Sequence, residues 1–394
     1  MIRTKVPDQK LNQHSRSTML PRRSLTTLIT IFGLAAPPAA GHGMLMHPPN
    51  WFMSDGLPRV CPMTEGADWS IGAMWYTNYT HVPEGTPIMP HDDPRRTFTD
   101  YSDFPGYGPG VYSPRNPWRA PGAAPINGPC GAFGGNMYGC HHHDGTPAPC
   151  VVGGTAFGPD ARDSYVHGKL GKNIKRTRWQ RGQVVEVAYI MYSNHAGGYS
   201  YRLARQSPNV SEAEFQDGHL DFVGDTHIVQ WGPNRSTRKT IPAVYTTNGT
   251  HPKGSMWARG PIPTCAHANG GYVWRGGSAI DCEPYPWRAE TRQKTQFPPP
   301  LPGLYGWGTD YTDLKTHQSG HYMPYFIIDR IQVPSDLPDG DYVLGWRWDA
   351  EQGAQVWNTC ADVQLVDHPV AEKEWAAWDD ACAHYPPTST PTRR

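Results

Sequence analysis

Short segments rich in β-branched and aromatic residues recur along the chain and predict β-strands. The clearest lies at 184–192, where VVEVAYIMY has the composition that packs well on a pleated sheet. We expect the next strand, at 199–204, to pair with it. Further strands are predicted at 227–231, 240–245, 325–333, 342–348 and 361–366.

Turn signals between these segments favour an all-β fold. Residues 335–340, SDLPDG, form one such turn, with Asp-Gly as its local signal. Repeated short strands of this kind predict an immunoglobulin-like or fibronectin-III-like β-sandwich. A bare sandwich needs only about 100 residues, so we expect the surplus in long, disulfide-tied loops that carry function. Residues 371–382 predict a short C-terminal helix, followed by a Pro/Thr-rich tail.

The long apolar run near the start, at 25–36, follows a basic pair and precedes small residues. This pattern predicts a secretory signal over 1–41, and the run is too short to span a bilayer. The expected cut follows Gly41, so the mature chain would begin at His42 and the protein would be secreted to the extracellular space. We expect the sandwich domain over 42–368 and the helix and tail over 369–394.

Charge argues against a nucleic-acid partner. The whole chain has 35 basic and 35 acidic residues. The leader holds six of the basic residues and one acidic residue, which leaves 29 against 34 and a formal charge of −5. A nucleic-acid binder would show a basic excess. With 42 Gly and 41 Pro, a helix bundle is also unfavourable.

All the cysteines lie after the leader, and their even number in an exported chain predicts disulfides. Their pairing cannot be read from the sequence. Four sequons are compatible with a glycoprotein, at Asn78, Asn209, Asn234 and Asn248. The eight cysteines are Cys61, Cys130, Cys140, Cys150, Cys265, Cys282, Cys360 and Cys382.

A histidine at a mature N-terminus is an unusual metal ligand. Its free α-amine and a ring nitrogen can bind one ion together, and such nitrogen ligands suit copper. A second histidine would complete a site with three nitrogens and leave positions open for oxygen species. The alternative is that cleavage falls elsewhere and His42 is an ordinary residue.

Three further motifs follow His42-Gly43 and its nearby Pro-Pro pair in a fixed order. They are SNHAGGYSYR at 193–202, DYVLGWRWD at 341–349 and QVWNTCADV at 355–363. This ordered set resembles the copper-dependent lytic polysaccharide monooxygenases, in the chitin-binding type-4-like branch found across eukaryotes. The resemblance spans the start, the middle and the end of the predicted mature domain.

The resemblance implies a role for each of three residues. His42 would be the N-terminal copper ligand and His195 the second ligand. Gln355 would be the glutamine that hydrogen-bonds to oxygen species at the copper. The alternatives are a structural loop histidine at His195 and an ordinary strand residue at Gln355.

The sequence departs from the family at the axial copper position. Trp357 stands where the family usually has Tyr or Phe. An indole has an N–H donor but no lone pair for a metal. Trp357 therefore cannot bind copper, although it could shield the axial face, alter the redox behaviour or block a substrate. Ala350 also stands where related sequences often have Cys.

The function that the resemblance implies is oxidative cleavage of chitin or cellulose by hydrogen abstraction at C1 or C4. It implies a secreted monomer that uses one copper ion, an external electron donor, and hydrogen peroxide or O₂, without a membrane partner. Because of Trp357, a non-catalytic carbohydrate-binding protein on the same fold is the alternative. A copper-binding or copper-transfer protein is the third hypothesis.

Two other histidine motifs are less convincing as metal sites. Cys140-His-His-His-Asp144 fits a loop tied by Cys140 and Cys150, with a weak adventitious metal site as the alternative. His317 and His321 have zinc-protease spacing but lack the glutamate that such hydrolysis needs. Aromatic residues that could stack on sugar, with burial as the alternative, are Trp51, Trp69, Trp75 and Tyr76.

Overall fold

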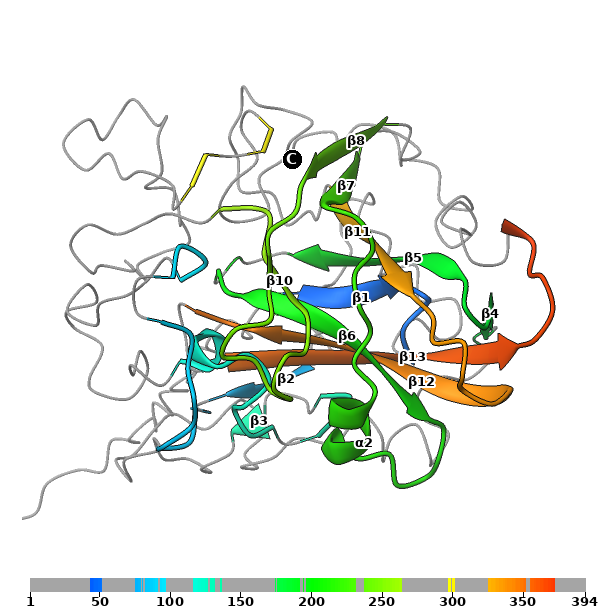
Figure 1. Ribbon diagram of the computed structural model, residues 1–394, viewed down its shortest axis with the longest axis horizontal. Helices are drawn as coiled ribbons and strands as arrows, with labels where there is room; N and C mark the ends of the chain where they lie inside the picture. Colours follow the sequence, from blue (N-terminus) through cyan, green and yellow to red (C-terminus); the bar gives the residue numbers. More distant parts are fainter. Residues whose placement is uncertain are drawn as a thin grey trace, which may run out of the picture. The chain divides into compact units, whose positions relative to one another are not determined.

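The fold is that of a computed structural model, shown as a ribbon in Figure 1. Its described residues all belong to one compact unit, Pro37–Arg394. They are 43–51, 75–78, 80, 82–90, 93–96, 116–126, 128–131, 135–136, 174, 176–191, 194, 196–231, 237–263, 297–298, 300–301, 325–351 and 355–372.

Two β-sheets make up most of this part of the chain (Figure 1). Sheet A is five-stranded, has the order β1-β5-β11-β7-β8, and is antiparallel throughout. Its strands are β1 (Gly43–His47), β5 (Val184–Met191), β7 (Thr226–Trp231), β8 (Thr237–Pro242) and β11 (Tyr325–Gln332).

Sheet B is eight-stranded and has the order β3-β2-β13-β12-β6-β10-β9, with β4 pairing in parallel with β13. A short helix, α2 (Glu212–Asp217), and a 3-10 turn, η3 (Pro117–Arg119), accompany the sheets. The strands of sheet B are β2 (Trp75–Asn78), β3 (Gly135–Asn136), β4 (Thr177–Gln180), β6 (Gly198–Arg205), β9 (Tyr245–Thr246), β10 (Trp257–Arg259), β12 (Gly340–Asp349) and β13 (Gln355–Val366).

The core lies between the two sheets, as the predicted all-β sandwich requires. Ile190 and Ile327 of sheet A belong to the same buried cluster as Leu203, Leu344 and Trp346 of sheet B. The fold class is therefore confirmed. Among the helices of the described residues, none is long and apolar enough to cross a bilayer.

The predicted strands are present, but one predicted pairing is wrong. β5 pairs with β1 and β11 in sheet A, whereas β6 pairs with β12 and β10 in sheet B. The two strands lie in different sheets because the chain turns between them, with Ala196 and Gly197 at φ angles of 54° and 78°. The segment predicted at 240–245 is divided between the end of β8 and the start of β9.

One disulfide lies within the described residues, between Cys130 and Cys360, with a Cα–Cα distance of 5.1 Å. It ties the 128–131 segment to β13 across 230 positions of sequence. Several predictions fall outside the described residues. They are the signal over 1–41, the C-terminal helix beyond Glu372, the Cys140–Cys150 loop, the His317 and His321 pair, and the remaining cysteines.

A buried polar cluster joins the two sheets inside the core. The hydroxyl of Tyr201 donates to Asp329 Oδ2 at 2.8 Å, and Tyr199 donates to Asp329 Oδ1 at 3.2 Å. His227 Nδ1 lies 2.5 Å from Asp329 Oδ1. Burial raises the pKa of both tyrosines, and the charge of Asp329 raises it further. Both tyrosines therefore stay protonated and act as donors.

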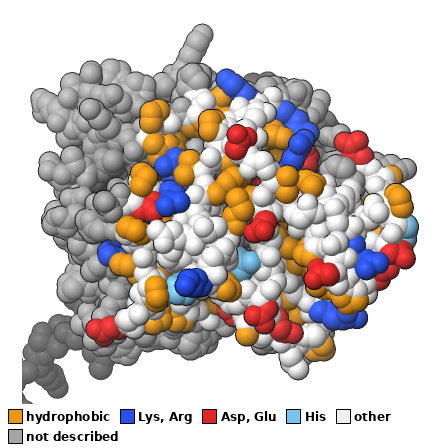
Figure 2. Space-filling view, in the orientation of Figure 1, with side chains coloured by type: hydrophobic (Ala, Val, Ile, Leu, Met, Phe, Trp, Pro, Cys, Tyr) orange, Lys and Arg blue, Asp and Glu red, His pale blue; other side chains and the backbone are white. Residues whose placement is uncertain are grey.

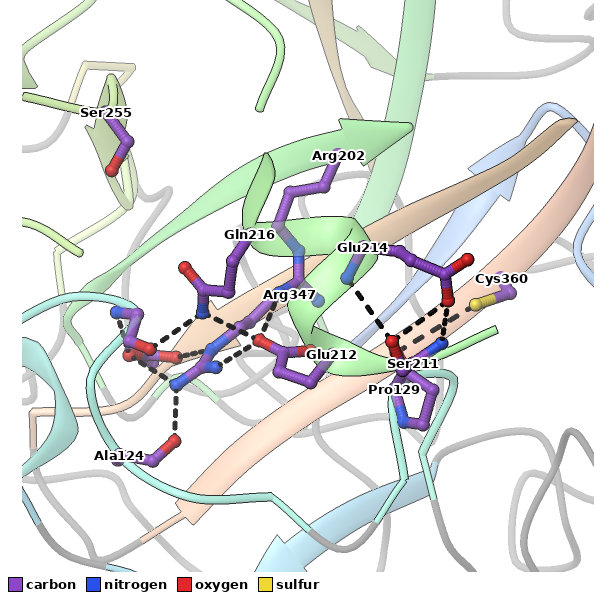
Figure 3. Close-up of polar contacts among 12 residues, drawn as sticks. Ala124, Pro129, Arg202, Ser211, Glu212, Glu214, Gln216, Ser255, Arg347 and Cys360 are labelled. Atoms are coloured by element: carbon purple, nitrogen blue, oxygen red, sulfur yellow. Dashed lines mark hydrogen bonds and ion pairs between the residues drawn. The ribbon is translucent and has the colours of Figure 1, made fainter. Parts of the chain in front are cut away.

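A second polar network fixes the helix α2 to sheet B (Figure 3). Glu212 Oε1 accepts hydrogen bonds from the guanidinium groups of Arg202, on β6, and Arg347, on β12. Arg347 Nε also donates to Asp349 Oδ1 at 2.7 Å. The side chains of Arg202 and Arg347 are 0% and 1% exposed, so their charges are compensated inside the protein.

We predict that Glu212→Gln lowers the free energy of unfolding by about 3 kcal/mol, because it leaves two buried guanidinium groups without their shared carboxylate. Chemical denaturation of the variant measures this loss. The exposed Asp217→Asn in the same helix is the matched control, and we expect little change from it.

The pH dependence provides a second readout of the same change. Burial alone would raise the pKa of Glu212, but the two guanidinium charges hold it below its ordinary value. The stabilisation is then complete above the unfolded pKa of about 4.3 and is lost as the pH falls through the lower folded pKa. A stability gap between wild type and variant that persists at pH values below the folded pKa would contradict the assignment.

Candidate functional site

The two predicted copper ligands, His42 and His195, lie outside the described residues, whereas the residues beside them in the chain do not. Gly43, which follows His42, is the first residue of β1. Asn194 and Ala196, which flank His195, are both buried. Gly43, Asn194 and Ala196 are therefore the described residues that lie next to the two predicted ligands in the chain.

Several strands begin or end at the same end of the sandwich. Gly43 pairs with Met191, so β1 begins where β5 ends. In sheet B, Asp349 at the end of β12 pairs with Gly198 at the start of β6. Asp349 also pairs with Val356, next to the first residue of β13. We call this the site end of the sandwich.

The indole of Trp348 lies near the chain neighbours of both predicted ligands. Its Nε1 donates to the carbonyl oxygen of Ala196 at 2.8 Å. A Cβ added to Gly43 would lie 3.1 Å from Trp346 Cη2 and 3.4 Å from Trp348 Cε3, so β1 starts directly against these rings. Trp348 therefore brings the chain beside His42 and the chain beside His195 to one place.

The described residues on either side of position 195 are held by hydrogen bonds from several directions. The side chain of Asn194 accepts from the backbone N–H of Ala196 at 2.9 Å and donates to the carbonyl of Ile262 at 2.6 Å. Gly260 N donates to the carbonyl of Gly197 at 2.8 Å. A Cβ at Gly197 would lie 2.1 Å from the carbonyl oxygen of Asp349. Only glycine can therefore occupy this position, both for its positive φ and for its space.

Gln355 and Trp357 lie on the same face of β13, two residues apart. Trp357 is 1% exposed, and its ring stacks on that of Trp348 with centroids 6.2 Å apart. Trp357 is therefore a core side chain. The Oε1 of Gln355 is buried and accepts no hydrogen bond from the described part of the chain. A ligand with an O–H or N–H group could satisfy it.

Charged groups surround the turn without forming a metal cluster in the described ranges. Glu351, beyond the end of β12, is buried, and its carboxylate acts on the guanidinium groups of Arg96 and Arg259. Burial lowers the pKa of Arg96, and the charge of Glu351 opposes that shift. No group of three or more His, Cys, Asp or Glu side chains in these ranges is placed to bind a metal.

The described surface seen in Figure 2 carries interspersed charges of both signs among hydrophobic side chains. This face has no extended basic patch of the kind that binds phosphate backbones. Of the aromatic residues considered for sugar stacking, Trp51 is 2% exposed, and its Nε1 donates to Asp362 Oδ1 at 2.9 Å. Trp51 is therefore a core residue.

Sequence reasoning missed the residues that position the site. Trp348 and Asn194 lie inside the quoted motifs, but no role was predicted for either. Trp346 and Trp348 stand on either side of Arg347 in β12, and alternation in a strand places both tryptophans on the same face. This pattern was a usable signal that the two rings pack together. The hydrogen bond to Ala196 depends on a fold contact across 152 positions and has no local signature.

Comparisons with known proteins give weak matches. No family model and no curated protein matches the chain. Among solved structures, it is similar to the lytic polysaccharide monooxygenase AA15 from Thermobia domestica in the Cu(I) state, with a TM-score of 0.24 and 13% identity over 50% of this chain and 66% of that chain. It is also similar to a family 123 glycoside hydrolase from Clostridium perfringens, with a TM-score of 0.19 and 8% identity over 52% and 25% of the two chains. Both TM-scores are too low to support a shared function.

We predict that Gly197→Ala destabilises the turn at the site end much more than Gly224→Ala destabilises its own turn. Both glycines have positive φ, but a Cβ at Gly224 meets nothing within 4 Å. Placing alanine at a positive φ costs about 1 kcal/mol of stability at either position. Any further loss of stability in Gly197→Ala therefore measures the clash of the new Cβ with Asp349. Thermal unfolding of the two variants makes the comparison, and equal losses would contradict this account of the turn.

Proposed function

We propose that this chain is a secreted, copper-dependent oxidase of polysaccharides. The observation that carries the proposal is that Trp348 bonds to Ala196 and lies near Gly43, where an added Cβ would be 3.4 Å from its ring. Ala196 and Gly43 are the chain neighbours of His195 and His42. The sequence motifs nominate these two histidines, and the residues next to them in the chain both lie near the buried ring of Trp348. The order of the motifs and the packing of the described residues therefore support the same site.

Copper would be held by the α-amine and ring of His42 and by the ring of His195. Bound copper supplies the one-electron chemistry with which O₂ or hydrogen peroxide can oxidise a sugar C–H bond. The residues present fit this group, since the buried Oε1 of Gln355 is an acceptor without a donor among the described residues. It would orient an O–H group of the oxidant through a hydrogen bond.

Buried rings and hydrogen bonds would support the proposed site. Trp348 and Trp357 stack at the site end, and both side chains are almost fully buried. Asn194 and Gly260 hold the turn at its two sides. Because the indole of Trp357 has no lone pair for a metal, Trp357 would serve as an apolar wall and not as a ligand.

The second candidate function is a non-catalytic carbohydrate-binding protein with the same copper site. Trp357 favours it, because the indole replaces the Tyr or Phe of the family and changes the surroundings of the metal. A protein of this kind would bind copper and an insoluble glycan but would release no oxidised product.

We predict that the copper-loaded protein, given a reductant and hydrogen peroxide or O₂, releases aldonic acids or 4-keto sugars from a polysaccharide. His195→Ala should reduce this release at least about 100-fold. Losing a residue that only supports a metal ligand lowers metal affinity or activity about tenfold to hundredfold, and losing the ligand itself should cost more. Mass spectrometry of the soluble products provides the measurement.

His368→Ala is the matched control, because this histidine is exposed and its ring pairs with Asp367 on the surface. It should release products at the wild-type rate. Unchanged oxidation by His195→Ala would refute the proposed ligand. Copper binding without oxidised products, on every glycan tested, would instead select the non-catalytic function.

A further inference from the structure

A small pocket of about 140 Å³ has Arg259 and Pro261 in its lining, next to the residues that bond to Asn194 and Gly197. Its walls are four prolines together with Val244, Phe297 and Arg259. Most of this lining is apolar, and Arg259 is its one charged member among the described residues. The pocket therefore combines flat hydrophobic walls with a single cation.

The position of the pocket relative to the turn is fixed by hydrogen bonds. Pro261, one of the wall residues, lies between Gly260 and Ile262 in the chain. Gly260 N donates to the carbonyl of Gly197, and the carbonyl of Ile262 accepts from Asn194 Nδ2. Arg259 itself pairs with Gly198 across β10 and β6. The pocket is thus built onto the segment that flanks His195.

Within the described ranges, the positive charge of Arg259 forms no ion pair with a carboxylate. Its guanidinium carbon lies 3.8 Å from the centroid of the Phe297 ring. Its Nε is buried and donates to no acceptor in the described part of the chain. Burial lowers the pKa of Arg259, and the carboxylate of Glu351 opposes that shift without forming an ion pair with it in these ranges. A stacked, partly desolvated guanidinium of this kind can bind a carboxylate through two parallel hydrogen bonds.

We propose that this pocket binds the carboxylate of an acidic sugar, so that the polysaccharide bound by this protein contains uronic acid. This inference rests on the proposed function, since Pro261 of the pocket lies between two residues that bond to Gly197 and Asn194, close in the chain to His195. The prolines and Phe297 offer flat apolar surfaces to the face of a sugar ring, and Arg259 supplies the charge that its carboxylate needs. Chitin and cellulose carry no such anion and would leave Arg259 without a partner.

The test is calorimetric binding of a short oligogalacturonate to the mature, chelator-treated protein. Binding should be weakened by salt and should exceed the binding of cellohexaose and chitohexaose. Arg259→Gln should weaken it by roughly tenfold or more, which is the usual effect of losing a hydrogen bond between charged groups. Arg259→Lys should be intermediate, because it keeps the charge but loses the planar fork.

Arg330→Gln is the matched control, because Arg330 is exposed on β11 and lines no part of the pocket. It should bind the oligogalacturonate like the wild type. Wild-type affinity in Arg259→Gln, or equal affinity of the wild type for cellohexaose, would overturn the proposal. Equal competition by a polyglutamate peptide would also overturn it, by assigning the pocket to acidic peptides.

If Arg259→Gln does not fold, Arg259→Lys and the salt dependence of the wild type decide the question. Because the protein is free of metal in these measurements, their outcome does not depend on copper chemistry. A protein that binds oligogalacturonate through Arg259 but yields no oxidised product would retain this inference and refute the oxidase. A protein that releases oxidised products but does not bind oligogalacturonate through Arg259 would refute this inference. It would retain the oxidase, acting on a neutral glycan.

Discussion

The hydrogen bond from the Trp348 indole to the carbonyl of Ala196, at 2.8 Å, is the contact on which the candidate site depends. It connects the end of β12 to a turn that leads from sheet A to sheet B. The same ring lies against Gly43, where β1 begins, and stacks on Trp357. One buried side chain therefore sets the separation of two segments that are about 150 residues apart. The Arg347–Asp349 pair and Glu212 in turn hold the end of β12 in place.

The sequence predicted the strands of the sandwich well, since β-branched and aromatic runs such as 184–192 and 325–333 mark buried strands wherever they pair. It did not predict the pairing. The 199–204 segment has the same pattern whether it joins sheet A or sheet B, and the choice depends on the turn at Ala196 and Gly197. The disulfide between Cys130 and Cys360 was equally out of reach, because eight cysteines leave many possible connectivities.

The candidate site was predictable only in part, for a similar reason. Gln355 and Trp357 could be nominated because they lie in a motif that resembles the family, although the strand that contains them begins at Gln355 and not at the predicted 361. The pocket around Arg259 could not, because it is assembled from segments near 242, 260 and 298 that have no common spacing in the sequence. The residues proposed for copper chemistry would thus lie in continuous sequence motifs, whereas the residues proposed for carboxylate recognition come together only when separate segments pack.

The central claim is that processing after Gly41 frees the α-amine of His42 for copper. The most direct test is the intact mass of the secreted protein, together with its copper content after removal of loosely bound metal. The account predicts a chain that begins at His42 and retains one copper ion, and predicts that an added N-terminal residue abolishes this retention. A mature chain that begins at another residue, or one that retains copper equally well with its α-amine blocked, would contradict it.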